Sequence, residues 1–360
     1  MRRAPLPLAL ALLALGACAS QRIAPTALVP GLPEADEVAL GCPAPQDWPY
    51  TNLVFEGGGV KGLAYGGSLE VLERQHVLPR IERVAGTSAG SIAAALVALG
   101  YTPTEIKSLL FSVDFAKFKQ GGGLGSVIRL FRRFGWYKGD YFHEWMRARV
   151  KEKTGNPDTT FRQLHAAGKF RDLYVVSTDL SRSEPRVFSH EHGENADVPV
   201  ADAVRMSMSI PLFFASVSFE KDVWVDGGVF WNYPLSLFDT SGGPNDATLG
   251  LHLDNCRDDD PDRAIDSLPV YFRSLFSALL DVQTEATRDR PEDVARTVRI
   301  DNLGIGTTDF ELTDAQKKAL IQQGHLAVCR YLRTVAEGKT PTWGECGAGT
   351  ARPVLSVPRS

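Results

Sequence analysis

The chain has 360 residues, of which 44% are hydrophobic and 23% are charged, and its formal net charge is −4. This composition is typical of a globular protein with one large or two average domains and a substantial core. The slightly acidic balance argues against nucleic acid as a partner, because such proteins carry an excess of lysine and arginine.

The first 17 residues have the anatomy of a bacterial secretory signal. Arg2 and Arg3 supply a positive start, and the apolar segment 6–17 is too short to span a bilayer as a mature helix. The segment ends in LGAC, which resembles a lipobox, so we expect removal of residues 1–17 and acylation of Cys18. Ala19 follows, a residue more typical of sorting to the outer membrane than aspartate. A chance cysteine at this place is the alternative.

Residues 18–49 contain several prolines and no sustained period, which predicts a semi-rigid, lipid-anchored tether. A catalytic domain is expected over 50–335 and an irregular tail over 336–360. Four cysteines remain beyond Cys18, an even number that suits an oxidising compartment. Their spacing matches no metal site and leaves three pairings possible, as well as unpaired thiols. The pairing favoured is Cys329 with Cys346, which would pin the tail to the last helix.

Strands and helices alternate along the predicted domain. Short apolar runs predict strands, and longer runs with helical spacing predict helices. The strands are expected over 52–56, 81–85, 173–178, 223–225, 248–253 and 297–300, and the helices over 62–75, 88–99 and 312–332. This alternation predicts an α/β domain with a mostly parallel sheet.

Residues 127–142 lie outside the alternation and mix aromatic side chains with arginines. Such a basic, aromatic, amphipathic stretch is typical of a segment that contacts a membrane surface. The alternative, which we favour from sequence, is a helix that packs its apolar face on the core and leaves its arginines in solvent.

The run 57-GGGVKG-62 predicts a site for an anion at the start of a helix. Gly57, Gly59 and Gly62 match the dinucleotide fingerprint, and Glu82 lies near the expected distance for a ribose ligand. Lys61 also makes the run similar to a phosphate loop. A third interpretation, an oxyanion hole for acyl chemistry, uses the same backbone N–H groups.

The sequence 86-GTSAG-90 follows a predicted strand and precedes an alanine-rich helix. This is the context of a nucleophile elbow, in which Gly86 and Gly90 allow a sharp turn that exposes Ser88. A helix-capping serine is the alternative interpretation of this residue.

A nucleophilic serine needs a base, and two kinds of residue are available. None of the histidines after Ser88 lies in the short loop typical of a late catalytic histidine, so we expect surface or packing roles for His143, His165, His190, His192, His252 and His325. Asp226 ends an alternating strand and is followed by Gly227 and Gly228, which would expose its carboxylate. An ordinary Asp-Gly hairpin turn is the alternative.

The chain resembles the patatin-like phospholipases. The matching blocks are 57–62, 86–90 and 226–228, with a fourth similar block at 203–217 and weaker likeness over roughly 50–335. This resemblance implies a three-layer α/β/α fold with a mostly parallel central sheet. Within the fourth block, Met206 and Met208 stand where smaller residues are usual in the family.

The resemblance also implies a mechanism. Ser88 would attack a lipid ester and Asp226 would act as its base, without histidine, metal or cofactor. The N–H groups of Gly57, Gly58 and Gly59 would bind the oxyanion. Lys61 matches a basic position of the family's glycine block and is expected in a supporting role.

Two other functions remain open on the sequence. A lipid-binding lipoprotein could keep the fold without turnover. A dinucleotide-binding oxidoreductase would explain the glycine run, but it leaves 86–90 and 226–228 without a role. We therefore expect a lipid acyl hydrolase, similar to phospholipase A or lysophospholipase, at a membrane of the bacterial envelope.

Overall fold

The computed structural model describes residues 26–37, 39–114, 117, 124–219, 221–256 and 264–343. The α-helices among them are α1 (Ala64–Arg74), α2 (Ala89–Ala98), α3 (Pro103–Ser112), α4 (Leu124–Arg133), α5 (Asp140–Thr154), α6 (Phe161–Ala166), α7 (Val200–Ser207), α8 (Leu268–Arg288), α9 (Pro291–Ala295) and α10 (Asp314–Ala336). The strands are β1 (Asn52–Phe55), β2 (Arg83–Thr87), β3 (Gly135–Tyr137), β4 (Asp172–Asp179), β5 (Glu184–Phe188), β6 (Leu212–Phe214), β7 (Val217–Phe219), β8 (Asp222–Asp226), β9 (Thr248–Asp254) and β10 (Thr297–Asp301).

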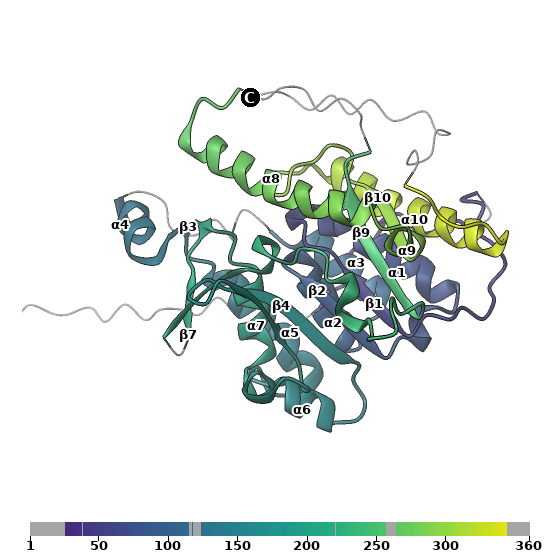
Figure 1. Cartoon of the computed structure of the whole chain (residues 1–360), viewed down its shortest axis with the longest axis horizontal. Helices are drawn as coiled ribbons and strands as arrows, with labels where there is room; N and C mark the ends of the chain where they lie inside the picture. Colours follow the sequence, from purple (N-terminus) through teal and green to yellow (C-terminus); the bar gives the residue numbers. More distant parts are fainter. Residues whose placement is uncertain are drawn as a thin grey trace, which may run out of the picture.

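One sheet organises the described residues, with a parallel centre in the order β10-β9-β1-β2-β4 (Figure 1). The strands β5, β7 and β8 add antiparallel pairs at one end, and β3 pairs with β6 in a separate small sheet. The α/β class and the mostly parallel sheet are therefore confirmed, as are the six predicted strands with shifts of one or two residues at their ends.

The two faces of the sheet are covered differently. Side chains of alternate strand residues such as Leu53, Phe55 and Val84 join the main core, to which α1, α2 and α10 contribute. The intervening residues point to the other face, where Val54 and Ala85 pack with side chains from the segment 233–238. Because both faces are buried, the central strands are continuous apolar runs, as is usual for parallel sheets.

The segment expected to be a tether lies in part on the domain. Trp48 is 2% exposed, and Leu32 and Ala35 are buried as well. Lys107 of α3 donates to the carbonyl oxygen of Pro33 at 2.7 Å. Apolar side chains between the prolines therefore bind the described part of this segment to the helical face.

The disulfide pairing differs from the one favoured on sequence. Cys42 is bonded to Cys329, with a Cα–Cα distance of 4.5 Å, so Cys329 is not available to Cys346, which lies outside the described residues. The bond joins the N-terminal segment to α10 over 287 positions. Pairings between such distant residues carry no local signal, which explains the wrong expectation.

Residues 127–142 do not form one helix. Helix α4 ends at Arg133, Phe134 has a φ of 53°, and β3 begins at Gly135. Phe131, Phe134 and Trp136 are all exposed, so the favoured expectation, an apolar face packed on the core, is wrong for these three side chains. No helix of the described residues is long and apolar enough to cross a membrane.

A buried ionic cluster holds α1, α3 and α10 together. Glu70 accepts from Lys107 Nζ at 2.7 Å and lies 3.0 Å from His325 Nε2. Burial alone raises the pKa of Glu70, but hydrogen bonds and charges of His325 and Lys107 outweigh it and lower the pKa to about 2. The side chains of Glu70 and Lys107 are almost fully enclosed, so each charge depends on the other.

We predict that Glu70→Gln lowers the free energy of unfolding by about 3–5 kcal/mol, because it leaves the Lys107 ammonium buried without its partner. Urea denaturation measures this, with the exposed Glu73→Gln as the matched control. A pKa of about 2 lies below the unfolded value of about 4.3. The contribution of Glu70 is therefore present above that value and lost as the pH falls through 2. Equal stability of both variants would contradict this account.

Candidate active site

Ser88 occupies a strained turn between β2 and α2, but it is 4% exposed and therefore buried, contrary to the expectation that the turn exposes it. Its φ is 51° and its ψ is −125°, a conformation that is costly for a residue with a side chain and is typical of nucleophile elbows. A Cβ on Gly86 would collide with the backbone of Gly90, and a Cβ on Gly90 would collide with the carbonyl oxygen of Phe55. Both predicted glycines therefore allow the close packing that this turn requires.

The pairing of β4 brings Ser88 and Asp226 together. One edge of β4 pairs with β5 over Val175–Asp179. The other edge pairs with β2 up to Val176, opposite Thr87, and with β8 from Ser177, opposite Asp226. The strands β2 and β8 thus run towards each other and meet end to end beside β4. Neighbouring positions on a strand are about 3.3 Å apart along its axis, so Ser88, the residue after Thr87, lies next to Asp226.

The carboxyl group of Asp226, expected to be exposed, is buried and has one oxygen that is unpaired in the described part of the chain. It is 1% exposed, and its Oδ1 accepts from the Gly228 N–H at 2.7 Å. Oδ2 has no hydrogen-bond partner among the described residues. Burial raises the pKa of Asp226 to about 7, while the Ser88 side chain and the Gly228 N–H act in the opposite direction. A carboxyl group with this pKa is suited to exchange a proton near neutral pH.

The glycine run lies beside the serine. A Cβ on Gly57 would lie 3.2 Å from Ser88 Cβ, so a larger residue would crowd the serine. The Gly57 N–H donates to the carbonyl oxygen of Asn232 at 3.0 Å and is therefore occupied. The N–H groups of Gly58 and Gly59 have no acceptor within the described part of the chain. The backbone donors that remain for an anion are thus those of Gly58 and Gly59.

Asn232 and Gln283 connect the glycine run to the Asp226 turn, and the sequence did not single out either residue. Asn232 donates through Nδ2 to Glu56 Oε1 at 3.0 Å and to the carbonyl oxygen of Gly57 at 3.2 Å. Gln283 of α8 accepts from the Asn232 N–H at 2.7 Å and donates to the carbonyl oxygen of Gly228 at 2.9 Å. One continuous network therefore holds both sides of the candidate site in register.

Glu56 is the buried end of this network. Burial raises the pKa of Glu56 to about 8, although Lys61, the Leu253 N–H and Asn232 lower it. His252 lies 3.4 Å away and is also buried, which lowers the pKa of His252 to about 4. Both side chains are therefore largely neutral at neutral pH. Lys61, expected in a supporting role, lies beside Gly58, and desolvation lowers its pKa, while Asp281 and Asp254 act in the opposite direction.

The fourth similar block locks the elbow to the sheet. Ser207 Oγ accepts from the Ser88 N–H at 2.8 Å and donates to the carbonyl oxygen of Val176 at 2.6 Å. The carbonyl oxygen of Ser209 accepts from the Asp226 N–H at 2.9 Å. The Ser88 hydroxyl donates to Met208 Sδ at 3.7 Å, so Met208 lies on the nucleophile itself.

The histidines expected to be structural have partners elsewhere. His325 contacts Glu70, and His143 lies 2.6 Å from Asp202. No interaction joins Ser88 or Asp226 to a histidine in the described residues. His165 and His190 stack with centroids 3.8 Å apart and planes within 3°, beside Asp172. His165 Nδ1 and His190 Nδ1 lie 2.6 Å and 3.6 Å from Asp172 Oδ1, and one ligand atom from each of the three residues lies within 4.8 Å of the others.

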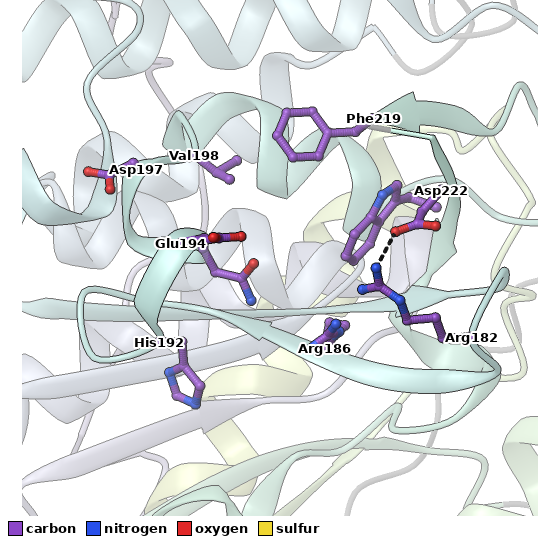
Figure 2. A pocket seen from close by; sticks show the side chains of 10 residues that line it. Arg182, Arg186, His192, Glu194, Asp197, Val198, Phe219 and Asp222 are labelled. Atoms are coloured by element: carbon purple, nitrogen blue, oxygen red, sulfur yellow. Dashed lines mark ion pairs between the residues drawn. The ribbon is translucent and has the colours of Figure 1, made fainter.

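A separate polar pocket of about 340 Å³ lies between β5, β8 and the turn at 192–198 (Figure 2). Arg182 pairs there with Asp222 at 3.1 Å, and acidic side chains also line the cavity. None of the predicted site residues lines it. We therefore place the candidate chemistry at Ser88 and Asp226 and not in this pocket.

The strand register contradicts the dinucleotide alternative. The strands β1 and β2 are parallel, with Asn52 opposite Arg83 and Phe55 opposite Gly86. Glu82 precedes β2, and the glycine run follows β1. The two features therefore lie at opposite ends of strands about 13 Å long, whereas a ribose ligand must lie at the same end as the glycines.

Cys18, the predicted lipidation site, lies outside the described residues.

Comparisons with known proteins identify relatives of this chain. Uncharacterized protein YqhO of Bacillus subtilis is 34% identical over 290 residues, which cover 76% of this chain and 95% of that protein. Probable lipid hydrolase 463L of Invertebrate iridescent virus 6 is 26% identical over 200 residues, which cover 52% of this chain and 63% of that protein.

A solved structure shares the fold. VipD from Legionella pneumophila superposes with a TM-score of 0.54 at 16% identity, covering 80% of this chain and 67% of that chain. The family model of the patatin-like phospholipases matches residues 53–239, more than half of the sequence and the whole region from the glycine run to the Asp226 turn. The chain belongs to the patatin-like phospholipase family.

Proposed function

We propose that the protein is a serine lipid acyl hydrolase with a Ser88–Asp226 dyad. The observation that carries this proposal is the end-to-end meeting of β2 and β8 beside β4. It places a serine on a strained elbow next to a buried carboxyl group, in a family of lipid hydrolases. No histidine is required, because Asp226 has a pKa of about 7 and one open oxygen.

The reaction follows from these positions. The Ser88 hydroxyl transfers its proton to Asp226 Oδ2 as Oγ attacks the ester carbonyl. The N–H groups of Gly58 and Gly59 stabilise the oxyanion, an effect worth about 100-fold or more in rate for each donor. Asp226 then protonates the departing alcohol and leaves an acyl-serine. Water, activated by Asp226 in turn, releases the fatty acid and restores the serine.

The substrate class proposed is a membrane lipid with an acyl ester. Phospholipids, lysophospholipids, acylglycerols and acyl thioesters all fit the chemistry of the dyad. One relative is named a probable lipid hydrolase and another triacylglycerol lipase 4, of Saccharomyces cerevisiae. Incubation with a panel of these lipids, with mass spectrometry of the released fatty acid, identifies which class is cleaved.

A place in the bacterial envelope belongs to the same proposal. The lipobox-like end of the leader supports acylation of Cys18, and more than one acyl chain gives stable anchoring. The bond between Cys42 and Cys329 suits an oxidising compartment, which supports export of the chain. Ala19 favours the outer membrane.

A non-catalytic lipid-binding lipoprotein is the second candidate function. Such a protein would have the same fold and lipid anchor as the proposed hydrolase and would differ only in that it does not turn over its lipid. Intact Ser88 and Asp226 with an open carboxylate oxygen favour the enzyme, and activity of single variants separates the two.

We predict that Ser88→Ala and Asp226→Ala each reduce ester hydrolysis by at least about 1000-fold, since each removes one half of the dyad. Release of fatty acid from a short-chain lipid ester measures this, and thermal melting checks the fold. Ser112→Ala and Asp47→Ala are the matched controls, because both positions are exposed. Full activity of Ser88→Ala would contradict the proposal that Ser88 is the nucleophile. Full activity of Asp226→Ala would contradict the assignment of Asp226 as the base.

The pH dependence of hydrolysis is a separate prediction. Asp226 accepts a proton only as the carboxylate, and burial raises its pKa to about 7. We expect kcat/KM to fall about tenfold for each pH unit below 7 and to level off above it. Initial rates on a water-soluble ester over this range measure the profile. A midpoint near 4, the value of an exposed aspartate, would show that a buried carboxyl group is not the base.

A further inference from the structure

Helix α8 has apolar side chains on two faces, and only one face is covered by the domain. Phe276 packs against the main core, and Leu280 is 9% exposed. The side chains of a second stripe are exposed at spacings of three and four residues, which places them on one face of the helix. This stripe, called here the α8 stripe, consists of Leu268, Tyr271, Leu275, Leu279 and Val282.

A second exposed apolar element carries positive charge. Phe131 of α4 is 77% exposed, and Phe134 and Trp136 beyond its C-terminus are exposed too. Arg132 and Arg133 are also exposed, and their side chains have no ion-pair partner in the described residues. This α4–β3 corner, residues 131–136, combines aromatic side chains with a positive charge.

The stripe and the corner both border the candidate active site. Gln283 of α8 donates to the carbonyl oxygen of Gly228 in the Asp226 turn. On the other side, β3 pairs with β6, which follows Met208, the partner of the Ser88 hydroxyl. From the corner, the first contact towards α8 is between the rings of Tyr137 and Phe213, whose centroids lie 4.9 Å apart with their planes tilted by 55°.

The path from the corner to α8 continues through the loop before α10. Phe213 lies 5.1 Å from Phe310, and Asp309 accepts from Arg273 of α8 at 2.7 Å. In Figure 1, α4 projects at the left edge and α8 runs along the upper side of the molecule. A continuous path of contacts therefore connects the α4–β3 corner with α8.

We propose that the α8 stripe and the α4–β3 corner dock on a lipid surface with anionic headgroups and hold the site against it. This rests on the proposed function, since it names the surface from which that site takes its substrate. Charge complementarity favours such a surface over a second copy of the chain. Arg132 and Arg133 suit anionic headgroups, whereas α8 has balanced charge, Arg288 being paired with Glu285, and contributes apolar contact.

Vesicle binding tests the proposal. The chain from residue 18 retains every described element; it is made with Cys18→Ser, to remove the anchor, and Ser88→Ala, to preserve the lipid. Co-sedimentation is measured with vesicles of phosphatidylcholine, with and without phosphatidylglycerol. We expect Leu275→Glu with Leu279→Glu to weaken binding to both vesicles at least about tenfold. Arg132→Glu with Arg133→Glu should remove the preference for phosphatidylglycerol, a loss of at least about tenfold.

Matched double variants change exposed leucines and exposed basic residues elsewhere on the surface. Leu28→Glu with Leu180→Glu alters two exposed leucines, and Lys151→Glu with Lys169→Glu reverses two exposed charges. Both controls should bind as the parent does, and thermal melting checks the fold of every variant.

Binding of the α8 variant at the level of its control would overturn the proposal. A dimer in analytical ultracentrifugation that the α8 variant converts to monomers, with vesicle binding unchanged, would assign the stripe to a second copy instead. Because vesicle binding is measured on the inactive Ser88→Ala chain, a failure of docking is distinct from a failure of hydrolysis. The latter would appear as absent fatty acid release by the Ser88-containing chain.

Discussion

The proposed active site depends on how β4 shares one of its edges between two strands. The strand β2 pairs with the first half of that edge and β8, running the opposite way, with the second half. Their ends meet between Val176 and Ser177, and this brings together two residues that are 138 positions apart in the chain, Ser88 and Asp226. A slip of one residue in either pairing would turn one side chain to the opposite face. Backbone hydrogen bonds thus set the distance between the proposed nucleophile and its proposed base more firmly than flexible loops would.

Burial gives this geometry its chemistry. The carboxyl groups of Asp226, in the proposed dyad, and of Glu56, which precedes the glycine run, both have raised pKa values because burial excludes water. Glu56 stays largely neutral and supports Asn232 and the Leu253 N–H. Asp226 is balanced between its two protonation states, which a proton acceptor and donor requires. The same exclusion of water strengthens hydrogen bonds from the N–H groups of Gly58 and Gly59, which have no acceptor among the described residues.

Local signals made part of this site predictable. The strand–GTSAG–helix pattern needs only neighbouring residues, and the turn at Ser88 matches it. Asp226 was found by its position at a strand end before two glycines, and β8 ends there. The core strands were predicted because burial on both faces makes them continuous apolar runs. Each of these features is encoded within about ten residues.

Long-range contacts were beyond the reach of the sequence. The occupied N–H of Gly57, the bridge through Asn232 and Gln283, and the bond between Cys42 and Cys329 all join segments that are distant in the chain. Residues 18–49 were predicted to form a tether, since their few apolar residues show no period, yet Trp48 is buried against the domain. The apolar face of 127–142 was expected to pack on the core, yet the aromatic residues of 131–136 are exposed. An amphipathic pattern does not determine what covers its apolar face.

Covalent labelling tests the central claim, that Ser88 is a nucleophile activated by Asp226, most directly. A fluorophosphonate probe reacts only with an activated serine and leaves a stable adduct that mimics the tetrahedral oxyanion. Mass spectrometry of the full chain after labelling should show one adduct, located by peptide mapping at Ser88, and the Asp226→Ala chain should remain unlabelled. Labelling of another serine, or undiminished labelling of Ser88 in the absence of the Asp226 carboxylate, would contradict the account.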